Sequence, residues 1–147
     1  MAGRAAATMT SWGIPAQFLS AAAAAHGDLG QVGPRDAVLA VSKSGETGEL
    51  LSLVGALRAR RIPVVAVTGS PRSRLARSAS GVLAHPDVEE GGPWNLAPMA
   101  SLACEGALLD ALTAELAVVL KRRPRDFAAH HPGGALGKKA ARLAGGR

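Results

Sequence analysis

Three short apolar runs, each followed by a polar or glycine-containing turn, dominate the middle of the chain. They cover residues 37–41, residues 63–67 and, more weakly, residues 82–84. Continuous apolar runs of this length are typical of strands that are covered on both faces, as in a parallel sheet. Between the first two runs, residues 48–61 carry an apolar stripe at helical spacing, which predicts a helix.

The flanking segments extend this alternation. Residues 3–12 predict an Ala-rich helix ending at Gly13, residues 98–123 predict a long helix stopped by Pro124, and the C-terminal part predicts a final basic helix. Residues 14–19 are a candidate strand, and residues 20–30 read as a loop. Before the helix that follows the second strand, Ser70 is the expected N-cap and Pro71 the first helical residue.

Strands that alternate with helices predict an α/β fold, here a three-layer sandwich around a parallel sheet of about four strands with right-handed crossovers. The 147 residues are 48% apolar and 19% charged, which suits one globular core. No repeat, linker or low-complexity tail divides the chain, so we expect a single domain over residues 1–147.

Cysteine content and the N-terminus bear on the compartment. A single cysteine, Cys104, excludes an internal disulfide framework. The Ala-rich segment after Arg4 resembles a signal peptide only in part, because Ser11, Gly13 and Pro15 interrupt its apolar core. No run is long and apolar enough to span a membrane. We therefore expect a cytoplasmic protein with no membrane partner.

The net charge of +6 comes from clustered basic residues, several of them at the ends of predicted helices. Cations in those places complement the helix dipole, which explains most of the charge. The alternative is a nucleic-acid surface, but no helix-turn-helix or set of stacking aromatics accompanies the charge. We expect no nucleic-acid partner, although a modest positive field can attract anionic metabolites.

The strongest local signal is the sequence Ser-Lys-Ser-Gly-Glu-Thr at residues 42–47, called the Ser–Thr loop below. A turn between a buried strand and a helix directs backbone N–H groups at one point, which favours an anion such as phosphate. The hydroxyls of Ser42, Ser44 and Thr47 add donors, and Gly45 allows close approach of the backbone. The alternative is a helix cap without a ligand, and the loop alone leaves both open.

Taken together, four motifs resemble a known family. Ser-x-Ser-Gly-x-Thr after an apolar strand resembles the sugar-phosphate loop of sugar isomerase (SIS) domains. The segments His26-Gly-Asp-Leu-Gly, Asn95-Leu-Ala-Pro and His131-Pro-Gly-Gly-Ala-Leu-Gly, in that order, are similar to those of the arabinose-5-phosphate isomerase family. The resemblance implies a flavodoxin-like strand order, a homo-oligomer, and interconversion of arabinose 5-phosphate and ribulose 5-phosphate through an enediol. We expect no cofactor.

The resemblance also implies roles for individual residues. Glu49, Glu90 and His131 match acid/base positions, and the Ser–Thr loop matches the phosphate contacts. His26 matches a histidine at the mouth of the active site, where an inhibitory metal can bind. Each acid/base candidate has a structural alternative: Glu49 near a positive helix end, Glu90 in a polar loop, and His131 in a turn before a proline.

Two departures from the family pattern keep a second function open. Family members begin with a first strand that ends in Gly-x-Gly-Lys-Ser, and nothing like it precedes Ala5. We therefore expect the first, central strand to be missing and the domain to be partial at its N-terminus, with no regulatory domains. Lys43 lies in the other loop and is no clear substitute. Met99 and Leu102 also replace hydroxyl residues of the family. These departures favour a non-catalytic sugar-phosphate sensor or partner subunit, whereas the intact acid/base set favours an isomerase.

Overall fold

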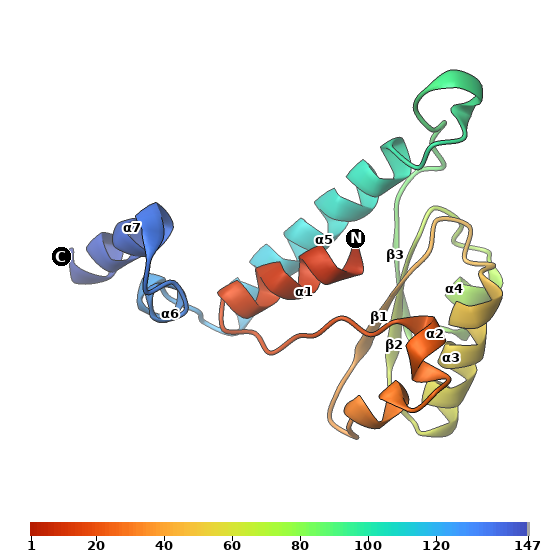
Figure 1. The fold of residues 1–147 in the computed structure, drawn as a ribbon, viewed down its shortest axis with the longest axis horizontal. Helices are drawn as coiled ribbons and strands as arrows, with labels where there is room; N and C mark the ends of the chain where they lie inside the picture. Colours follow the sequence, from red (N-terminus) through yellow and green to blue (C-terminus); the bar gives the residue numbers. More distant parts are fainter. Residues whose placement is uncertain (147) are drawn as a thin grey trace. The chain divides into compact units, whose positions relative to one another are not determined.

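The computed structural model describes residues 1–146, which form two compact units. The first unit contains residues 1–2 and 19–108, and the second contains residues 3–18 and the described residues from 109 onward. In chain order the elements are α1 (Ala2–Ser11), α2 (Ala21–Ala24), η1 (Asp28–Gln31), β1 (Val38–Val41), α3 (Gly48–Ala59), β2 (Val64–Thr68), α4 (Arg74–Ser78), β3 (Gly81–Ala84), η2 (Pro93–Asn95), α5 (Ala100–Val119), α6 (Pro124–Ala129) and α7 (Gly134–Gly145) (Figure 1).

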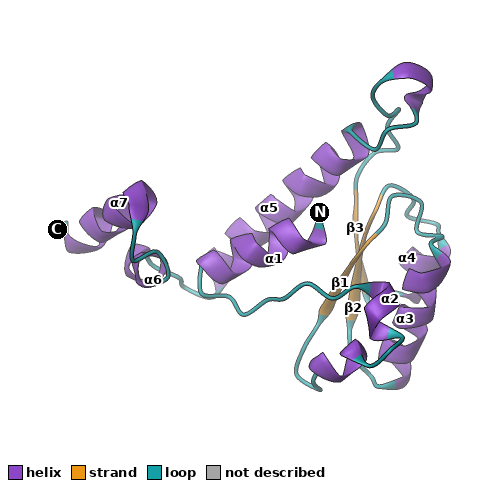
Figure 2. Ribbon diagram, viewed as in Figure 1, coloured by secondary structure: helices purple, strands orange, loops and turns teal. Residues whose placement is uncertain are grey.

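The predicted parallel sheet is confirmed, and it lies in the first unit (Figure 2). Its order is β1-β2-β3, with Val38 opposite Val64 and Val65 opposite Gly81. The side chain of Val67 in the central strand β2 is fully buried, and so is that of Thr68. Burial on both faces explains why the strands read as continuous apolar runs rather than as alternating ones.

An aliphatic core joins the sheet to the helices that lie beside it, α2, α3 and α4 (Figure 1). Helix α3 contributes Val54 and Leu57, and α4 contributes Leu75, each at most 1% exposed. These side chains pack in one cluster with Val64 and Ala66 of β2. The predicted α/β class is therefore confirmed, with the helical stripe of residues 48–61 facing the sheet.

The predicted strand at residues 14–19 is wrong, and the described residues contain a sheet of three strands rather than four. The amide of Ile14 donates to the carbonyl of Met9 at 3.0 Å and so closes the end of α1. Pro15 has no N–H to donate. The first two residues of this segment therefore have no free backbone N–H with which to pair with a neighbouring strand.

Two local expectations also need correction. Residues 20–30 are not simply a loop, because Ser20 caps the one-turn helix α2 by accepting from the amide of Ala23 at 3.4 Å, and η1 follows. Ser70 is not the N-cap of α4. Ser73 fills that place and accepts from the amide of Ala76 at 3.3 Å, because the amide of Ser73 first closes a turn onto the carbonyl of Ser70.

The second unit contains α1, most of α5, and the pair α6 and α7, which pack on each other. Arg4 pairs with Asp110 at 3.0 Å, and the ring of Trp12 meets Phe127 edge-on with centroids 4.9 Å apart. The expected final basic helix is confirmed as α7. None of the helices within residues 1–146 combines the length and apolar character needed to cross a bilayer.

Candidate functional site

The loops that follow the three strands are joined by their main chains at the carboxyl edge of the sheet. The amide of Gly69 donates to the carbonyl of Lys43 at 3.0 Å, and the amide of Leu75 donates to the carbonyl of Gly45 at 3.1 Å. The amide of His85 donates to the carbonyl of Thr68 at 3.1 Å. This edge is where open α/β sheets bind their ligands.

A side-chain contact adds to this connection. The carboxylate of Glu46 accepts from the amide of Arg74 at 2.8 Å and from its guanidinium Nε at 2.5 Å. The backbone hydrogen bond from Arg74, followed by its side chain, lowers the pKa of Glu46 below its usual value. The Ser–Thr loop is thereby joined to the start of α4.

The Ser–Thr loop is folded on itself by short contacts. The hydroxyl oxygens of Ser42 and Thr47 lie 3.1 Å apart, the amide of Gly45 donates to Ser42 Oγ at 3.1 Å, and the amide of Glu46 donates to Ser44 Oγ at 3.2 Å. The turn passes through Gly45 at φ +63°, a conformation that favours glycine.

The start of α3 is open, which distinguishes this loop from a simple helix cap. Thr47 stands at the N-cap position but makes no capping hydrogen bond with its side chain. The first amide bonded within the helix is that of Leu51, which donates to the carbonyl of Thr47 at 3.0 Å. The amides of the first turn therefore point out of the helix end, where an anion is favoured.

A hollow of about 600 Å³ lies among the three loops. Ser44 lines it from the first loop, Ser70 and Arg72 from the second, and His85 from the third. The carboxylates of Glu46 and Asp87 line it as well, so hydroxyl groups, a guanidinium group and two carboxylates face the same hollow. This mixed lining suits a ligand that carries hydroxyl groups as well as charge.

His85 is a residue that the sequence analysis did not single out, although it directly follows a buried strand at this edge. Its side chain is 5% exposed, and Nδ1 lies 2.7 Å from the carbonyl oxygen of Pro86. Because a carbonyl only accepts, Nδ1 carries a hydrogen, and Nε2 is buried without a hydrogen-bond partner among the described residues. A Cβ at Gly69 would lie 2.8 Å from Cε1 of this ring, so the backbone there must approach closely.

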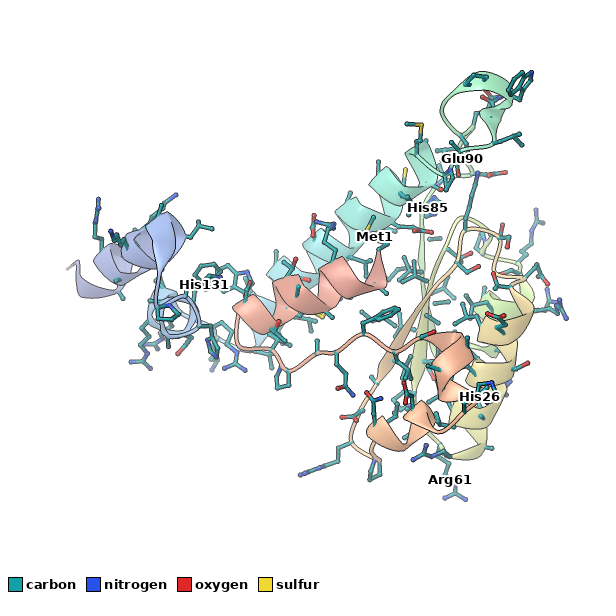
Figure 3. All side chains as sticks on the ribbon, viewed as in Figure 1. Met1, His26, Arg61, His85, Glu90 and His131 are labelled. Atoms are coloured by element: carbon teal, nitrogen blue, oxygen red, sulfur yellow. The ribbon has the colours of Figure 1, made fainter. Side chains whose placement is uncertain are left out.

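Glu90 is held by three donors. Its Oε1 accepts from Nζ of Lys43 at 2.9 Å, and its Oε2 accepts from the amides of Met99 at 2.9 Å and Ser101 at 3.1 Å. Hydrogen bonding from Ser101, followed by that from Lys43, lowers the pKa of Glu90 to about 2. The carboxylate therefore stays ionised near neutral pH and acts as a cap for the start of α5 (Figure 3).

The lowered pKa predicts an acid-dependent loss of stability. A carboxyl group whose pKa is lower in the folded state contributes stability above its ordinary pKa of 4.5, and this is lost as the pH falls toward about 2. Glu90→Gln should therefore be less stable than the unmodified chain at pH 7, and the difference should shrink between about pH 4.5 and pH 2. Urea unfolding at several pH values measures this.

The exposed neighbour Glu89 supplies the matched control for that measurement. Glu89→Gln should follow the unmodified chain at every pH. A stability difference for Glu90→Gln that stays constant down to pH 2 would contradict the assignment of the contacts.

Two other predicted residues of the first unit, Glu49 and His26, are exposed. Glu49 is exposed in the first turn of α3, and its carboxylate contacts no donor within the described chain. His26 is exposed after α2, and Figure 3 shows it away from Glu90. Within residues 1–146 no group of three or more His, Cys, Asp or Glu side chains forms a metal site. The residues present thus do not complete a site around His26, whose role as a metal ligand stays a prediction.

His131 lies in the second unit, just after α6. Its ring stacks on that of Phe127 with centroids 4.0 Å apart and planes 10° apart. Nδ1 lies 2.9 Å from the carbonyl oxygen of Phe127, so this nitrogen carries a hydrogen, and in a neutral ring Nε2 is the nitrogen with the lone pair. The arrangement fixes one tautomer of a half-buried imidazole.

Comparison with known proteins gives consistent matches. A family model described as "SIS domain" matches residues 1–115. Arabinose 5-phosphate isomerase KdsD of Escherichia coli K12 is 42% identical over 134 residues, which are 91% of this chain and 41% of that protein. Arabinose 5-phosphate isomerase KpsF of E. coli is 41% identical over 133 residues, which are 90% of this chain and 42% of that protein. The chain thus spans about two fifths of the length of these curated relatives.

Among solved structures, the E. coli CFT073 protein c3406 in complex with A5P is similar with a TM-score of 0.84 and 34% identity. The match covers 88% of this chain and 69% of that one. Both the sequence and the fold of this chain therefore resemble the same group of proteins.

Proposed function

Because the chain belongs to the SIS domain family, whose model matches residues 1–115, we propose that it binds a sugar phosphate at the Ser–Thr loop and interconverts arabinose 5-phosphate and ribulose 5-phosphate. The observation that carries the proposal is the open start of α3, where no side chain caps the first-turn amides and the hydroxyl oxygens of Ser42 and Thr47 lie 3.1 Å apart in the loop just before them. The two curated relatives are both named as isomerases, which favours an enzyme over a non-catalytic sensor or partner subunit.

The reaction is an isomerisation with no net change in oxidation state, because C1 is reduced from an aldehyde to an alcohol while C2 is oxidised from an alcohol to a ketone. A base removes the proton from C2 of the aldose while O1 gains a proton, which gives an enediol. O2 then loses its proton and C1 gains one, which gives the ketose. Proton transfer of this kind needs groups that exchange protons near the working pH and are within reach of the sugar.

Two of the three predicted acid/base residues have side chains suited to that task. Among the described residues the carboxylate of Glu49 contacts no donor, and Glu49 lies two positions after the Ser–Thr loop, so we assign it to the proton on carbon. His131 keeps Nε2 as an acceptor in its neutral form, so we assign it to the protons on oxygen. Glu90 matches an acid/base position by resemblance, but its three donors and its low pKa favour a holding role.

The phosphate assignment predicts that binding requires the phosphoryl group. Arabinose 5-phosphate should bind, and unphosphorylated arabinose should bind far more weakly. The double variant Ser44→Ala/Thr47→Ala should bind arabinose 5-phosphate about tenfold more weakly, or weaker still, because a hydrogen bond to a charged group contributes roughly 1.5–3 kcal/mol. Isothermal titration calorimetry measures both differences.

Ser52→Ala is the control for the double variant. Ser52 lies on the same helix, but its hydroxyl donates to the carbonyl of Gly48 at 3.1 Å. Its removal should leave the affinity unchanged. Equal binding of the two sugars, or an unchanged affinity in the double variant, would refute the phosphate site.

Self-association is the last part of the proposal. Several large apolar side chains near the end of the loop after β3 are exposed: Trp94 at 86%, Leu96 at 77% and Met99 at 61%. Apolar side chains gathered on a surface mark places where proteins associate. We expect this loop to lie at a contact between copies of the chain, in keeping with the homo-oligomer that the resemblance implies.

A further inference from the structure

Lys43 lies in the Ser–Thr loop, but both its backbone carbonyl and its side-chain ammonium group bond to residues outside that loop. Its carbonyl accepts from the amide of Gly69 at 3.0 Å and from the hydroxyl of Thr68 at 2.9 Å. Its Nζ, on a side chain that is 34% exposed, lies 2.9 Å from Oε1 of Glu90 and donates to the carbonyl of Val88 at 3.0 Å. One residue of this loop therefore contacts the segments that follow both other strands.

Glu90 passes this connection on to α5. Its Oε1 meets the ammonium group of Lys43, and its Oε2 accepts from the amides of Met99 and Ser101 at the start of that helix. Its side chain is 8% exposed, so the ion pair is partly shielded from water. The path from the Ser–Thr loop to the start of α5 thus runs through a single carboxylate.

A second contact closes the same segment near Glu90. A Cβ on Gly91 would lie 2.6 Å from the sulfur of Met99, and Gly91 pairs with Ala97 in an antiparallel bridge. The loop between Glu90 and α5 therefore folds back on itself, which fixes Glu90 relative to the start of α5. The carboxylate of Glu90 can then hold the Lys43 side chain in place.

We propose that Lys43 is a positioning residue, whose ion pair with Glu90 fastens the Ser–Thr loop to the start of α5 and holds the phosphate donors of that loop in place. This role rests on the proposed function of the loop. Glu90 serves as the anionic anchor in this arrangement. Without the Lys43 ammonium group, Glu90 would keep its helix amides but lose its connection to the loop.

The test uses Lys43→Met, which keeps the length of the side chain and removes its charge, and Lys43→Arg, which restores a cation. Lys139→Met, on the exposed surface of α7, is the control for loss of one positive charge. The first measurement is the titration midpoint of the Glu90 carboxyl by NMR. The second is the affinity for arabinose 5-phosphate, with inorganic phosphate as a simpler probe, by calorimetry.

We expect the Glu90 midpoint to rise in Lys43→Met and the affinity for arabinose 5-phosphate to fall about three- to tenfold, as loss of a partly shielded ion pair implies. Lys43→Arg should restore both values, and Lys139→Met should change neither. An unchanged midpoint in Lys43→Met would overturn the ion pair, and an altered midpoint with unchanged affinity would overturn the positioning role.

Failure of the proposed function gives a different result. If the unmodified chain binds neither probe, the phosphate site itself is refuted. The positioning role is then decided by the backbone amide chemical shifts of Ser44 and Gly45. Shifts that move in Lys43→Met and return in Lys43→Arg support it, and shifts that stay in place overturn it.

Discussion

Replacing His131 with alanine is expected to slow the proposed isomerisation of ribulose 5-phosphate by about 10²- to 10⁴-fold, the usual contribution of a positioned general acid or base. The ring is stacked on Phe127, and Nδ1 is held by a backbone carbonyl, so Nε2 is the nitrogen left to exchange protons. Histidine suits this task because its unperturbed pKa of about 6.5 lies near the working pH. Initial rates at saturating and at low substrate separate the effect on kcat from the effect on KM.

His130 provides the internal control for that experiment. Its Nδ1 also bonds to a carbonyl, that of Asp126 at 2.6 Å, and its ring packs against Gly13, where a Cβ would lie 2.8 Å from Cε1. His130→Ala removes a similar ring from the adjacent position and should lose little activity in the folded protein. Equal losses in the two variants, or full activity in His131→Ala, would refute the assignment of His131.

Gly45→Ala is expected to destabilise the fold by roughly 2–5 kcal/mol. Gly45 has φ +63°, and an added Cβ would clash with Oγ of Ser73 and lie 3.3 Å from Cβ of Leu75. Ser73 caps α4, and Leu75 is fully buried in the core, so neither can move away at low cost. The free energy of unfolding in urea measures the loss.

Gly48 is the matched control, since it lies three positions further on, at the start of α3, with no atom within 4 Å of an added Cβ. Gly48→Ala should leave stability unchanged or raise it by about 0.4–1 kcal/mol, because alanine restricts the unfolded chain more than glycine does. Similar losses in both variants would show that the close contact beneath Gly45 is not the cause.

The sequence predicted the sheet because burial leaves a pattern that can be read locally. Strands β1 to β3 lie where apolar runs occur, and α3 carries the stripe that faces them. The prediction of a strand at residues 14–19 was wrong for a reason that the apolar pattern does not report. The amide of Ile14 already donates to the carbonyl of Met9 at the end of α1. Likewise, Ser70 and Ser73 are equally good caps by residue type, and only the turn between them selects Ser73.

Sequence could predict the position of the part of the candidate site whose residues are consecutive in the chain. The Ser–Thr loop follows a strand and precedes a helix, so its position at the carboxyl edge could be expected from sequence. The ion pair between Lys43 and Glu90 joins residues far apart in the chain, and no local pattern reports such a contact. His85 was missed for a related reason, because its burial depends on the close approach of Gly69 from the neighbouring loop.

The main-chain hydrogen bonds that join the three loops constrain how this protein can evolve. Gly69 donates to the carbonyl of Lys43, and Leu75 donates to the carbonyl of Gly45. The bonds themselves need only a backbone N–H, which every residue except proline has. Gly45 and Gly69 are required for a further reason, because a Cβ at either position would meet a neighbouring side chain. One inserted residue, however, displaces the following donor by up to about 3.5 Å, beyond the reach of its acceptor. The lengths of these loops are therefore constrained independently of the residue types that the close contacts and the proposed site require, and an insertion or deletion in a related protein would require a rearranged carboxyl edge.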